Sequence, residues 1–153
     1  MSANGKTGHQ ARAQDCNCLA IRQAARHVSQ FYDQLFAPVG LRATQFAILS
    51  RLRHNGPMTI NALAAALVMD RTTLGRNILP LQRDGMIEIV ASPGDRRRRE
   101  LGLTDAGLAR HRDGVERWAV AQQRFDAVFG SERAKTLRLL LQEVVASDFG
   151  EGG

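Results

Sequence analysis

Two stretches of the chain concentrate side chains that form strong, directional hydrogen bonds. The first lies between residues 70 and 78 and supplies Arg71, Thr72, Thr73, Arg76 and Asn77. Arginine can bind guanine with two hydrogen bonds, asparagine can bind adenine in the same way, and threonine can contact a thymine methyl group or a phosphate. The second is the run Arg96, Arg97, Arg98 and Arg99, a type of side chain that a narrow, electronegative minor groove attracts. Together the two stretches predict a nucleic-acid interface.

Each stretch taken alone also has an ordinary interpretation. A short helix pair with polar residues on one face is often a solvated helical hairpin, and four consecutive arginines are often a solvated strand end or a nonspecific basic patch. Their order and spacing along the chain favour the nucleic-acid interpretation. Gly75, between the polar residues, permits close approach of a phosphate or a base, at a cost of about 1 kcal/mol in helix propensity.

The composition of the chain agrees with a small basic globular protein. Its 153 residues are 44% hydrophobic and 24% charged, which is typical of one globular domain. The net charge of +6 favours a polyanionic partner, nucleic acid first and an anionic membrane second. Residues 1–15 are polar and predict a flexible arm rather than a signal peptide, and the longest apolar run, 62–69, is too short to span a bilayer. A cytoplasmic protein without metal or other cofactor is expected.

Apolar residues recur at helical spacing over the ranges 19–36, 44–55, 59–67, 70–83, 104–129 and 131–149. The residues placed to cap the N-termini of the later helices are Thr44, Thr59, Asp70, Thr104 and Ser131. Within the fourth range, Leu74, Ile78 and Leu81 share one face and leave the polar residues on the other. Pro80 removes a backbone donor, so we expect a kink near Leu79 or the end of the helix there.

Two short β-rich runs, Met86–Ala91 and Arg98–Leu103, follow these helices, with Ser92–Arg97 as the tip of a hairpin. Strand alternation then sends two of the four arginines to each face. A helix pair joined by a short turn and followed by a basic hairpin is typical of a winged helix-turn-helix. The predicted fold is therefore mainly α, with a two-stranded wing.

Six features of the sequence carry a resemblance to a known family: Gly40-Leu41, Gln45, the helix pair at 59–83, Asp84-Gly85-Met86-Ile87, Asp95-Arg96-Arg97 and Leu103-Thr104-Asp105-Ala106-Gly107. In these features residues 16–147 resemble the MarR family of transcriptional regulators. The resemblance implies a repressor that binds double-stranded DNA as a homodimer, on a pseudo-palindromic site with half-sites roughly 34 Å apart. It also implies that Arg97 enters the minor groove, that Asp95 orients it, and that residues 71–77 begin the recognition helix.

The same resemblance divides the chain into functional parts. It implies a winged helix-turn-helix at about 41–104 and dimerisation helices at about 16–37 and 104–148. Heptad-like seams at 21–35, 108–129 and 137–149 agree with this division, because together they exceed what one small lobe needs to bury. Packing within one chain is the alternative for any single seam.

Members of this family usually respond to small phenolic or aromatic-carboxylate compounds bound between the dimerisation helices and the winged lobe. The candidate ligand-binding residues are Arg22, Arg26, His27, Phe31, Tyr32 and Phe46. Arginine can pair with a carboxylate and aromatic rings can clamp a planar ligand. The alternative for each is a structural role, in an ion pair, on the surface or in the core, and His111 and Trp118 have the same two interpretations.

A subset of the family instead senses peroxide through a cysteine on the first helix. Cys18 lies 22 residues before Gly40, which resembles the position of that cysteine, and Tyr32 falls where those members keep a tyrosine that hydrogen-bonds the thiolate. Arg22 and Ala43 depart from the pattern, because those members carry tyrosines there. Arg22 favours a thiolate one turn away, whereas a buried free cysteine is commonly inert.

Three classes of function follow from the residues. A sequence-specific DNA-binding regulator is favoured by the helix pair and the basic hairpin. An enzyme is disfavoured, because Cys18 is the sole plausible nucleophile and no paired carboxylates or glycine-rich phosphate loop occur. An architectural or interaction protein with a nonspecific basic surface is the third class.

Overall fold

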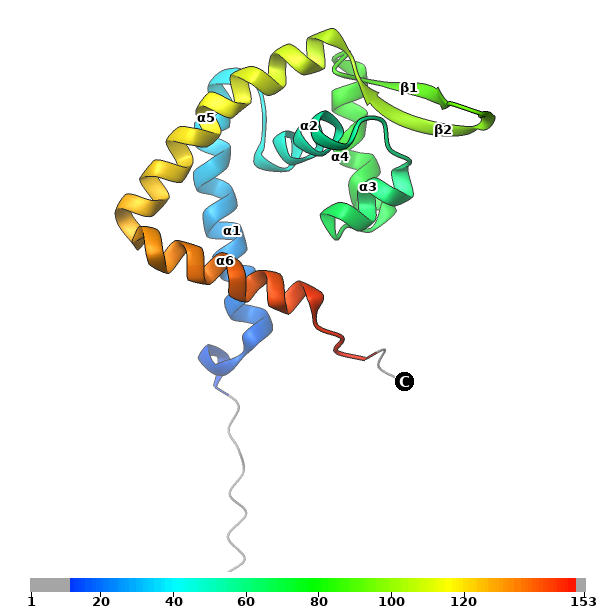
Figure 1. Cartoon of the computed structure of the whole chain (residues 1–153). Helices are drawn as coiled ribbons and strands as arrows, with labels where there is room; N and C mark the ends of the chain where they lie inside the picture. Colours follow the sequence, from blue (N-terminus) through cyan, green and yellow to red (C-terminus); the bar gives the residue numbers. More distant parts are fainter. Residues whose placement is uncertain (1–11, 151–153) are drawn as a thin grey trace, which may run out of the picture.

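The computed structural model describes residues 12–150, which form six α-helices and one two-stranded antiparallel sheet (Figure 1). In chain order these are α1 (Asn17–Phe36), α2 (Ala43–Asn55), α3 (Ile60–Leu67), α4 (Arg71–Arg83), β1 (Ile87–Ser92), β2 (Asp95–Leu103), α5 (Asp105–Phe129) and α6 (Ser131–Ala146). Two short 3₁₀ helices, η1 (Ala13–Asp15) and η2 (Ala37–Val39), flank α1. The predicted arm therefore lies mostly outside the described residues, and its last three residues are helical. The predicted fold class is confirmed.

The lobe formed by α2, α3, α4 and the hairpin surrounds a closed apolar core. Ile48 and Leu49 of α2, Leu63 of α3 and Leu74 of α4 are fully buried. The predicted inner face of α4 is confirmed, since Ile78 and Leu81 are buried beside Leu74. The hairpin closes one side of this core, and Met58, just before α3, adds an antiparallel bridge to Leu101 of β2.

Three of the predicted helix caps are confirmed by hydrogen bonds. The side-chain oxygens of Thr59, Asp70 and Thr104 accept the backbone N–H groups of Ala62, Thr73 and Gly107 at 3.2, 2.8 and 3.0 Å. Each cap satisfies an N–H group that the helix itself leaves without an acceptor.

The caps predicted at Thr44 and Ser131 are wrong. Helix α2 begins at Ala43, whose N–H donates to Asp33 Oδ1 of α1 at 2.8 Å, while Arg42 N–H donates to Gln45 Oε1 at 3.0 Å. A carboxylate from a neighbouring helix thus replaces the local hydroxyl that the sequence offered. Ser131 is the first residue of α6 and makes no capping bond.

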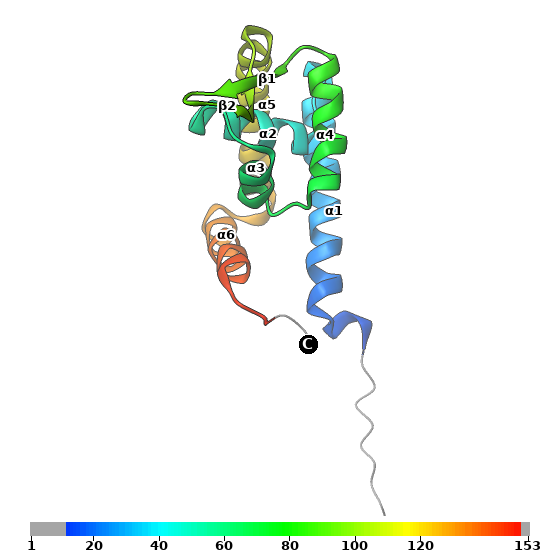
Figure 2. The ribbon, with the colours of Figure 1, turned by 90° about the vertical axis from the view of Figure 1, so that its right-hand side faces the viewer.

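Helix α4 does not end near Leu79. It continues through Pro80 to Arg83 and is drawn as one helix in Figure 2. The proline removes one backbone donor, but Leu81 is buried and Asp84 N–H donates to Pro80 O at 3.0 Å. Tertiary packing therefore holds the last turn in place despite the proline.

The hairpin is longer and more irregular than the sequence predicts. Strand β2 begins at Asp95, not Arg98, and Ser92 pairs with Asp95, so the turn is Pro93-Gly94, with Gly94 at φ +85°. The next pair is Ala91 with Arg99. The intervening residues 96–98 consequently have no partner on β1 and form a bulge, which interrupts the expected alternation of the arginines.

The remaining helices form an elongated frame beside the lobe. Helix α1 packs against the long helix α5, and α6 turns back from the far end of α5 (Figure 1). Figure 2 shows α6 set apart from α1. Ala134 is the one buried residue of α6. Within residues 12–150, no helix combines the length and the apolar content needed to cross a membrane.

Candidate nucleic-acid interface and ligand cavity

The start of α4 is held by Asp70. One carboxylate oxygen accepts the Thr73 N–H at 2.8 Å, and the other accepts the Thr73 hydroxyl at 2.7 Å. These bonds, the backbone bond first, lower the pKa of Asp70, so the carboxylate stays ionised. The Thr73 hydroxyl therefore donates its hydrogen bond within the protein, and Thr73 has a structural role in the cap.

The other predicted residues of α4 divide into two kinds. Asn77 Nδ2 donates to Thr73 O at 2.9 Å, which leaves its Oδ1 without a protein donor. Arg71, Thr72 and Arg76 are exposed and form no hydrogen bond through their side chains within residues 12–150. The first two turns of α4 thus present to an external partner three polar side chains that form no hydrogen bond within the described residues.

Gly75 lies among these residues on an open part of the helix. A Cβ atom built at this position meets nothing within 4 Å. The fold therefore does not require a glycine here, in contrast to Gly107, where a Cβ would lie 2.1 Å from Met86 O. Absence of a side chain at residue 75 leaves the backbone of α4 accessible from outside.

The bulge on β2 carries three exposed arginines, Arg96, Arg97 and Arg98, and Arg99 beside it is exposed as well. Asp95 Oδ1 accepts the backbone N–H of Arg97 at 2.9 Å. Asp95 therefore holds the main chain at Arg97, and its role in orienting Arg97 toward DNA stays a prediction. The side chain of Arg97 is left to extend from the wing.

Within residues 12–150, the arginines in the first two turns of α4 and on the wing form no internal ion pair. Across residues 12–150 the one ion pair within 4 Å joins Arg83 and Asp84, at the far end of α4. Unpaired guanidinium groups on a helix and on a projecting hairpin (Figure 1) are arranged to neutralise a polyanion. The fold and this surface together define a winged helix-turn-helix protein that binds DNA.

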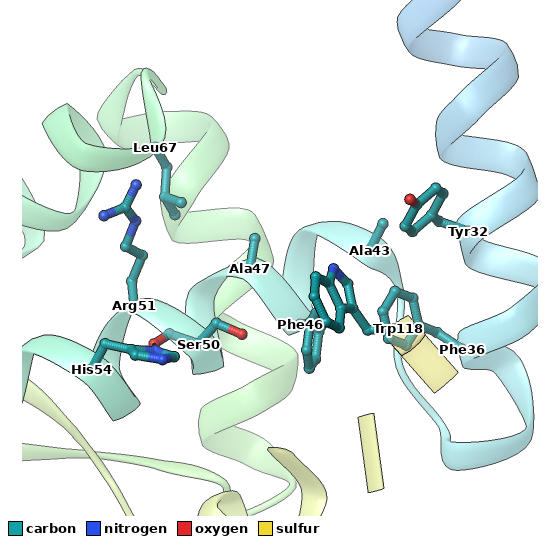
Figure 3. Close-up of a pocket in the computed structure, with 10 residues that line it drawn as sticks. All are labelled: Tyr32, Phe36, Ala43, Phe46, Ala47, Ser50, Arg51, His54, Leu67 and Trp118. Atoms are coloured by element: carbon teal, nitrogen blue, oxygen red, sulfur yellow. Dashed lines mark hydrogen bonds between the residues drawn. The ribbon is translucent and has the colours of Figure 1, made fainter. Parts of the chain in front are cut away.

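A cavity of about 460 Å³ lies between the frame and the lobe (Figure 3). Its lining residues come from α1, α2, α3 and α5: Tyr32, Phe36, Ala43, Phe46, Ala47, Ser50, Arg51, His54, Leu67 and Trp118. Of the predicted ligand-binding residues, the structure brings Tyr32 and Phe46 together here. It places Arg22, Arg26, His27 and Phe31 elsewhere on α1, the first three exposed. Within one chain the six predicted residues therefore do not all gather at this cavity, and their role in ligand binding stays a prediction.

Of the residues that α2 contributes to this cavity, Phe46 alone was predicted from the sequence. Six lining residues lie on one face of that helix, at positions 43, 46, 47, 50, 51 and 54. This spacing repeats every three to four residues and could have been recognised as a helical stripe that mixes apolar and cationic side chains. Trp118 reaches the same cavity from α5 (Figure 3).

His111 supports this cavity from behind and does not line it. Its ring is buried, stacks on Phe46 at 5.4 Å between centroids, and lies with Nε2 3.1 Å from Ser50 Oγ. Burial lowers the pKa of His111, and the neighbouring positive groups His54 and Arg53 lower it further. The imidazole is therefore neutral at physiological pH.

Tyr32 closes the opposite end of the cavity. Its hydroxyl donates to Gln122 Oε1 of α5. Burial raises the pKa of Tyr32, with a smaller contribution from Asp126 in the same direction. The phenol therefore stays protonated and joins α1 to α5.

The two cysteines lie at the exposed start of α1. Cys16 Sγ accepts the Leu19 N–H at 3.4 Å and caps the helix, and Cys18 is exposed on the first turn. Tyr32 is fourteen residues further along the same helix, about 21 Å away. The tyrosine cannot hydrogen-bond Cys18 of its own chain. Among residues 12–150, no three His, Cys, Asp or Glu side chains gather as metal ligands would.

Comparison with known proteins agrees with the class defined by the structure. The MarR family model matches residues 41–98. The HTH-type transcriptional regulator PecS of Dickeya dadantii (strain 3937) is 30% identical over 120 residues, which is 76% of this chain and 72% of PecS. The chain belongs to the MarR family and is a MarR-type transcriptional regulator.

Solved structures extend the similarity to most of the fold. The M. tuberculosis regulator MosR in complex with DNA is 33% identical, with a TM-score of 0.72, over 86% of this chain and 98% of MosR. CouR from Rhodococcus jostii RHA1 bound to p-coumaroyl-CoA is 20% identical, with a TM-score of 0.75, over 93% of this chain and 99% of CouR. At that identity the second likeness concerns the fold alone. All the proteins named are transcriptional regulators.

Proposed function

We propose that the chain is a homodimeric repressor that binds a pseudo-palindromic operator and releases it when a small aromatic ligand enters the cavity. DNA binding is supported by the exposed arginines at the start of α4 and on the wing, which form no ion pair within the described residues. A relative with 33% identity, MosR, has been solved with DNA. Repression is the simplest outcome for a protein that holds its operator in the ligand-free state.

The proposed DNA contacts follow from the hydrogen bonds that each side chain already forms within the protein. Arg71, Thr72 and Arg76 reach base edges or phosphates in the major groove, and Asn77 contributes its free Oδ1. Thr73 acts through the cap of α4. On the wing, Arg97 enters the minor groove from a main chain fixed by Asp95, and Arg96 and Arg98 contact the flanking phosphates.

The proposed dimer covers apolar surface that one chain leaves in water. Leu139, Leu140 and Val145 of α6 are exposed, and Val128 near the end of α5 is 90% exposed. Side chains of this size are rarely left in such a cluster on a monomer. We propose that a second copy packs on α1, α5 and α6, with dimerisation segments at about 16–37 and 104–148 and the winged lobe at about 41–104.

The ligand part of the proposal rests on the cavity. It joins α1 and α5 of the frame to α2 and α3 of the lobe, so a bound molecule changes how the two parts pack. Its lining includes the aromatic rings of Tyr32, Phe36, Phe46 and Trp118, which suit a planar aromatic ligand. CouR, a protein of this fold, holds a p-coumaroyl thioester. Peroxide sensing by Cys18 is not proposed, because Tyr32, the expected partner of its thiolate, lies about 21 Å further along α1 in the same chain.

The test is binding to a palindromic duplex selected from a random library, followed by fluorescence anisotropy at several salt concentrations. We expect affinity to fall steeply with salt and footprinting to show two protected half-sites. Arg97→Ala is expected to weaken binding about tenfold or more, because it removes a groove contact and leaves the Asp95 bond to the backbone intact.

Arg83→Ala is the matched control, because it removes the same charge from the far end of α4, where Arg83 pairs with Asp84. This variant is expected to bind like the wild type. Salt-independent binding, uniform footprint coverage or a monomeric protein would each contradict the proposed function. Uniform coverage would instead favour an architectural role.

A further inference from the structure

A groove of about 370 Å³ lies between α4 and the wing of the lobe. One wall is a face of α4 that carries Gly75, Leu79 and Gln82, at spacings of four and three residues. The other wall is the hairpin, and Ile60 of α3 adds to the lining. This groove shares no lining residue with the cavity between the frame and the lobe.

The hairpin directs one of its faces to this groove. Arg99 and Leu101 are two residues apart on β2, and Ile89 of β1 pairs with Leu101, so the three side chains share a face. All three line the groove. Glu100 also contributes to the lining, but strand alternation directs its side chain to the opposite face, where its carboxylate accepts the Ser92 hydroxyl at 3.1 Å. The charged group that the hairpin turns toward α4 is therefore the guanidinium group of Arg99.

The groove combines a positive charge with exposed apolar surface. Arg99 is exposed and forms no ion pair within residues 12–150. Leu79 on one wall is 65% exposed, and Ile89 on the other is 49% exposed. At Gly75 a Cβ atom would meet nothing within 4 Å, so the backbone of α4 is bare at the groove. Such a surface is complementary to a chain that alternates anionic groups with apolar ones, as a sugar–phosphate strand does.

The position of the groove points to one such strand. In the proposed complex α4 occupies the major groove of the DNA, and Arg97 of the wing enters the neighbouring minor groove. One sugar–phosphate strand separates a major groove from the minor groove beside it. That strand therefore passes between α4 and the wing, along the surface that Arg99 and Leu79 line.

We propose that this groove seats the sugar–phosphate strand between the two DNA grooves, with a phosphate held by Arg99 and a deoxyribose packed on Leu79 and Ile89. The inference rests on the proposed function and adds a contact that lies outside the proposed major-groove and minor-groove contacts. Phosphate contacts fix the register and orientation of a protein on the duplex and carry no base sequence directly. Arg99 is therefore a positioning residue for α4 and the wing.

The first experiment separates a phosphate contact from a base contact. Anisotropy measures affinity over several salt concentrations, for the selected duplex and for one with an altered base pair in each half-site. We expect Arg99→Gln to weaken both duplexes by the same factor, about tenfold, and to lower the salt slope by about one for each protomer bound. Arg83→Gln is the matched control, because it removes the same charge just beyond the groove, and should bind like the wild type.

The second experiment locates the phosphate. Neutral methylphosphonate linkages are placed one at a time along both strands of a half-site. In the wild type we expect losses of about tenfold at one or two linkages between the bases next to α4 and the minor-groove site of Arg97. These linkages should have no further effect in Arg99→Gln, because the charge pair is already absent. Arg83→Gln should retain the wild-type pattern.

Opposite charges at Ile89 test the apolar wall. Ile89 is not among the buried residues of the lobe core, so both Ile89→Glu and Ile89→Lys should fold, which circular dichroism checks. Ile89→Glu is expected to weaken duplex binding about tenfold or more by repelling the strand, and Ile89→Lys to bind at least as tightly as the wild type. A purely structural role for Ile89 would move both variants in the same direction.

The inference is overturned if Arg99→Gln keeps the affinity and salt slope of the wild type, or if the same linkages stay sensitive in Arg99→Gln. It is also overturned if Ile89→Glu and Ile89→Lys are affected alike. Specific duplex binding by the wild type, weakened in Arg97→Ala, tests the proposed function separately. Such binding with an unaffected Arg99→Gln refutes this inference alone. A wild type that binds no duplex refutes the proposed function and this inference with it.

Discussion

The winged lobe and the end helices both leave groups uncovered, but the groups are of opposite kinds. The lobe exposes arginines such as Arg71 and Arg97 over a core that is fully closed around Leu63. The end helices expose apolar side chains such as Leu140 and Val128 and bury little of α6. An exposed guanidinium group is solvated at little cost, whereas exposed apolar area costs about 25 cal/mol per Å². The lobe is therefore complete before it meets DNA, whereas the end helices leave apolar surface that the proposed dimer would cover.

The largest effect that would test this contrast is expected from a charge on α6. Leu141→Glu places a carboxylate in the apolar groove that Leu141 and Val145 line, and we expect dimer affinity to fall about 100-fold or more. Operator binding should fall as well, because the two winged lobes that bind the two half-sites are no longer held together. Sedimentation velocity measures the assembly, and anisotropy measures the DNA affinity.

Leu79→Glu is the matched control, because Leu79 is 65% exposed on α4 of the lobe. Assembly of this variant should match that of the wild type. If Leu141→Glu stays dimeric, or if both variants dissociate equally, the end helices are not the interface and the contrast between the two regions is wrong.

The second effect compares one substitution at two glycines. Gly107→Ala, at the start of α5, would place a Cβ 2.1 Å from Met86 O, so we expect it to destabilise the lobe by about 3 kcal/mol. Gly75→Ala meets nothing within 4 Å and should instead stabilise α4 by about 0.5–1 kcal/mol. Chemical denaturation measures both changes.

DNA affinity provides a second test of the Gly75→Ala variant. If a phosphate or base approaches the bare backbone at Gly75, the more stable Gly75→Ala variant should bind DNA about tenfold more weakly. Unchanged DNA affinity in Gly75→Ala would show that α4 contacts DNA through side chains alone. A fully stable Gly107→Ala variant would show that the start of α5 can move away from the hairpin.

Local hydrogen bonding and periodicity explain why much of the lobe could be predicted. Thr59, Asp70 and Thr104 cap their helices as expected, because each cap depends on residues within three positions along the chain. Thr44 failed because Asp33, a residue from another helix, supplies the acceptor for Ala43. Pro80 failed to end α4 because burial of Leu81 outweighs the loss of one backbone bond.

The two candidate sites differ in the same respect. The α4 residues and the arginine run could be proposed from the sequence because each set lies close together along the chain. The bulge at 96–98 could not be predicted, since it depends on the pairing register. The cavity joins four helices, so family resemblance directed attention to Arg22 and Arg26 while the structure places Arg51 there. When a site is assembled from distant segments, each segment contributes few residues, so the sequence pattern within any one segment is weak.

The smallest expected effect concerns His111, at the junction of the two regions. Its pKa is lowered in the folded state by burial first and by His54 and Arg53 second, whereas an unfolded histidine keeps a pKa of about 6.5. As pH falls below about 6.5, the unfolded chain takes up a proton before the folded chain does. Stability is therefore greatest above that pH and declines as pH falls toward the lower folded pKa.

Denaturation midpoints between about pH 7.5 and 5.5 measure this slope, in a window where carboxylates stay mostly ionised. His111→Asn should reduce the slope, and His27→Gln, at an exposed position on α1, should retain it. An equal slope in wild type and His111→Asn would mean that another group carries the titration. Since His111 stacks on Phe46 at 5.4 Å, a confirmed slope would also predict that acid loosens the wall of the cavity on which the lobe and the frame meet.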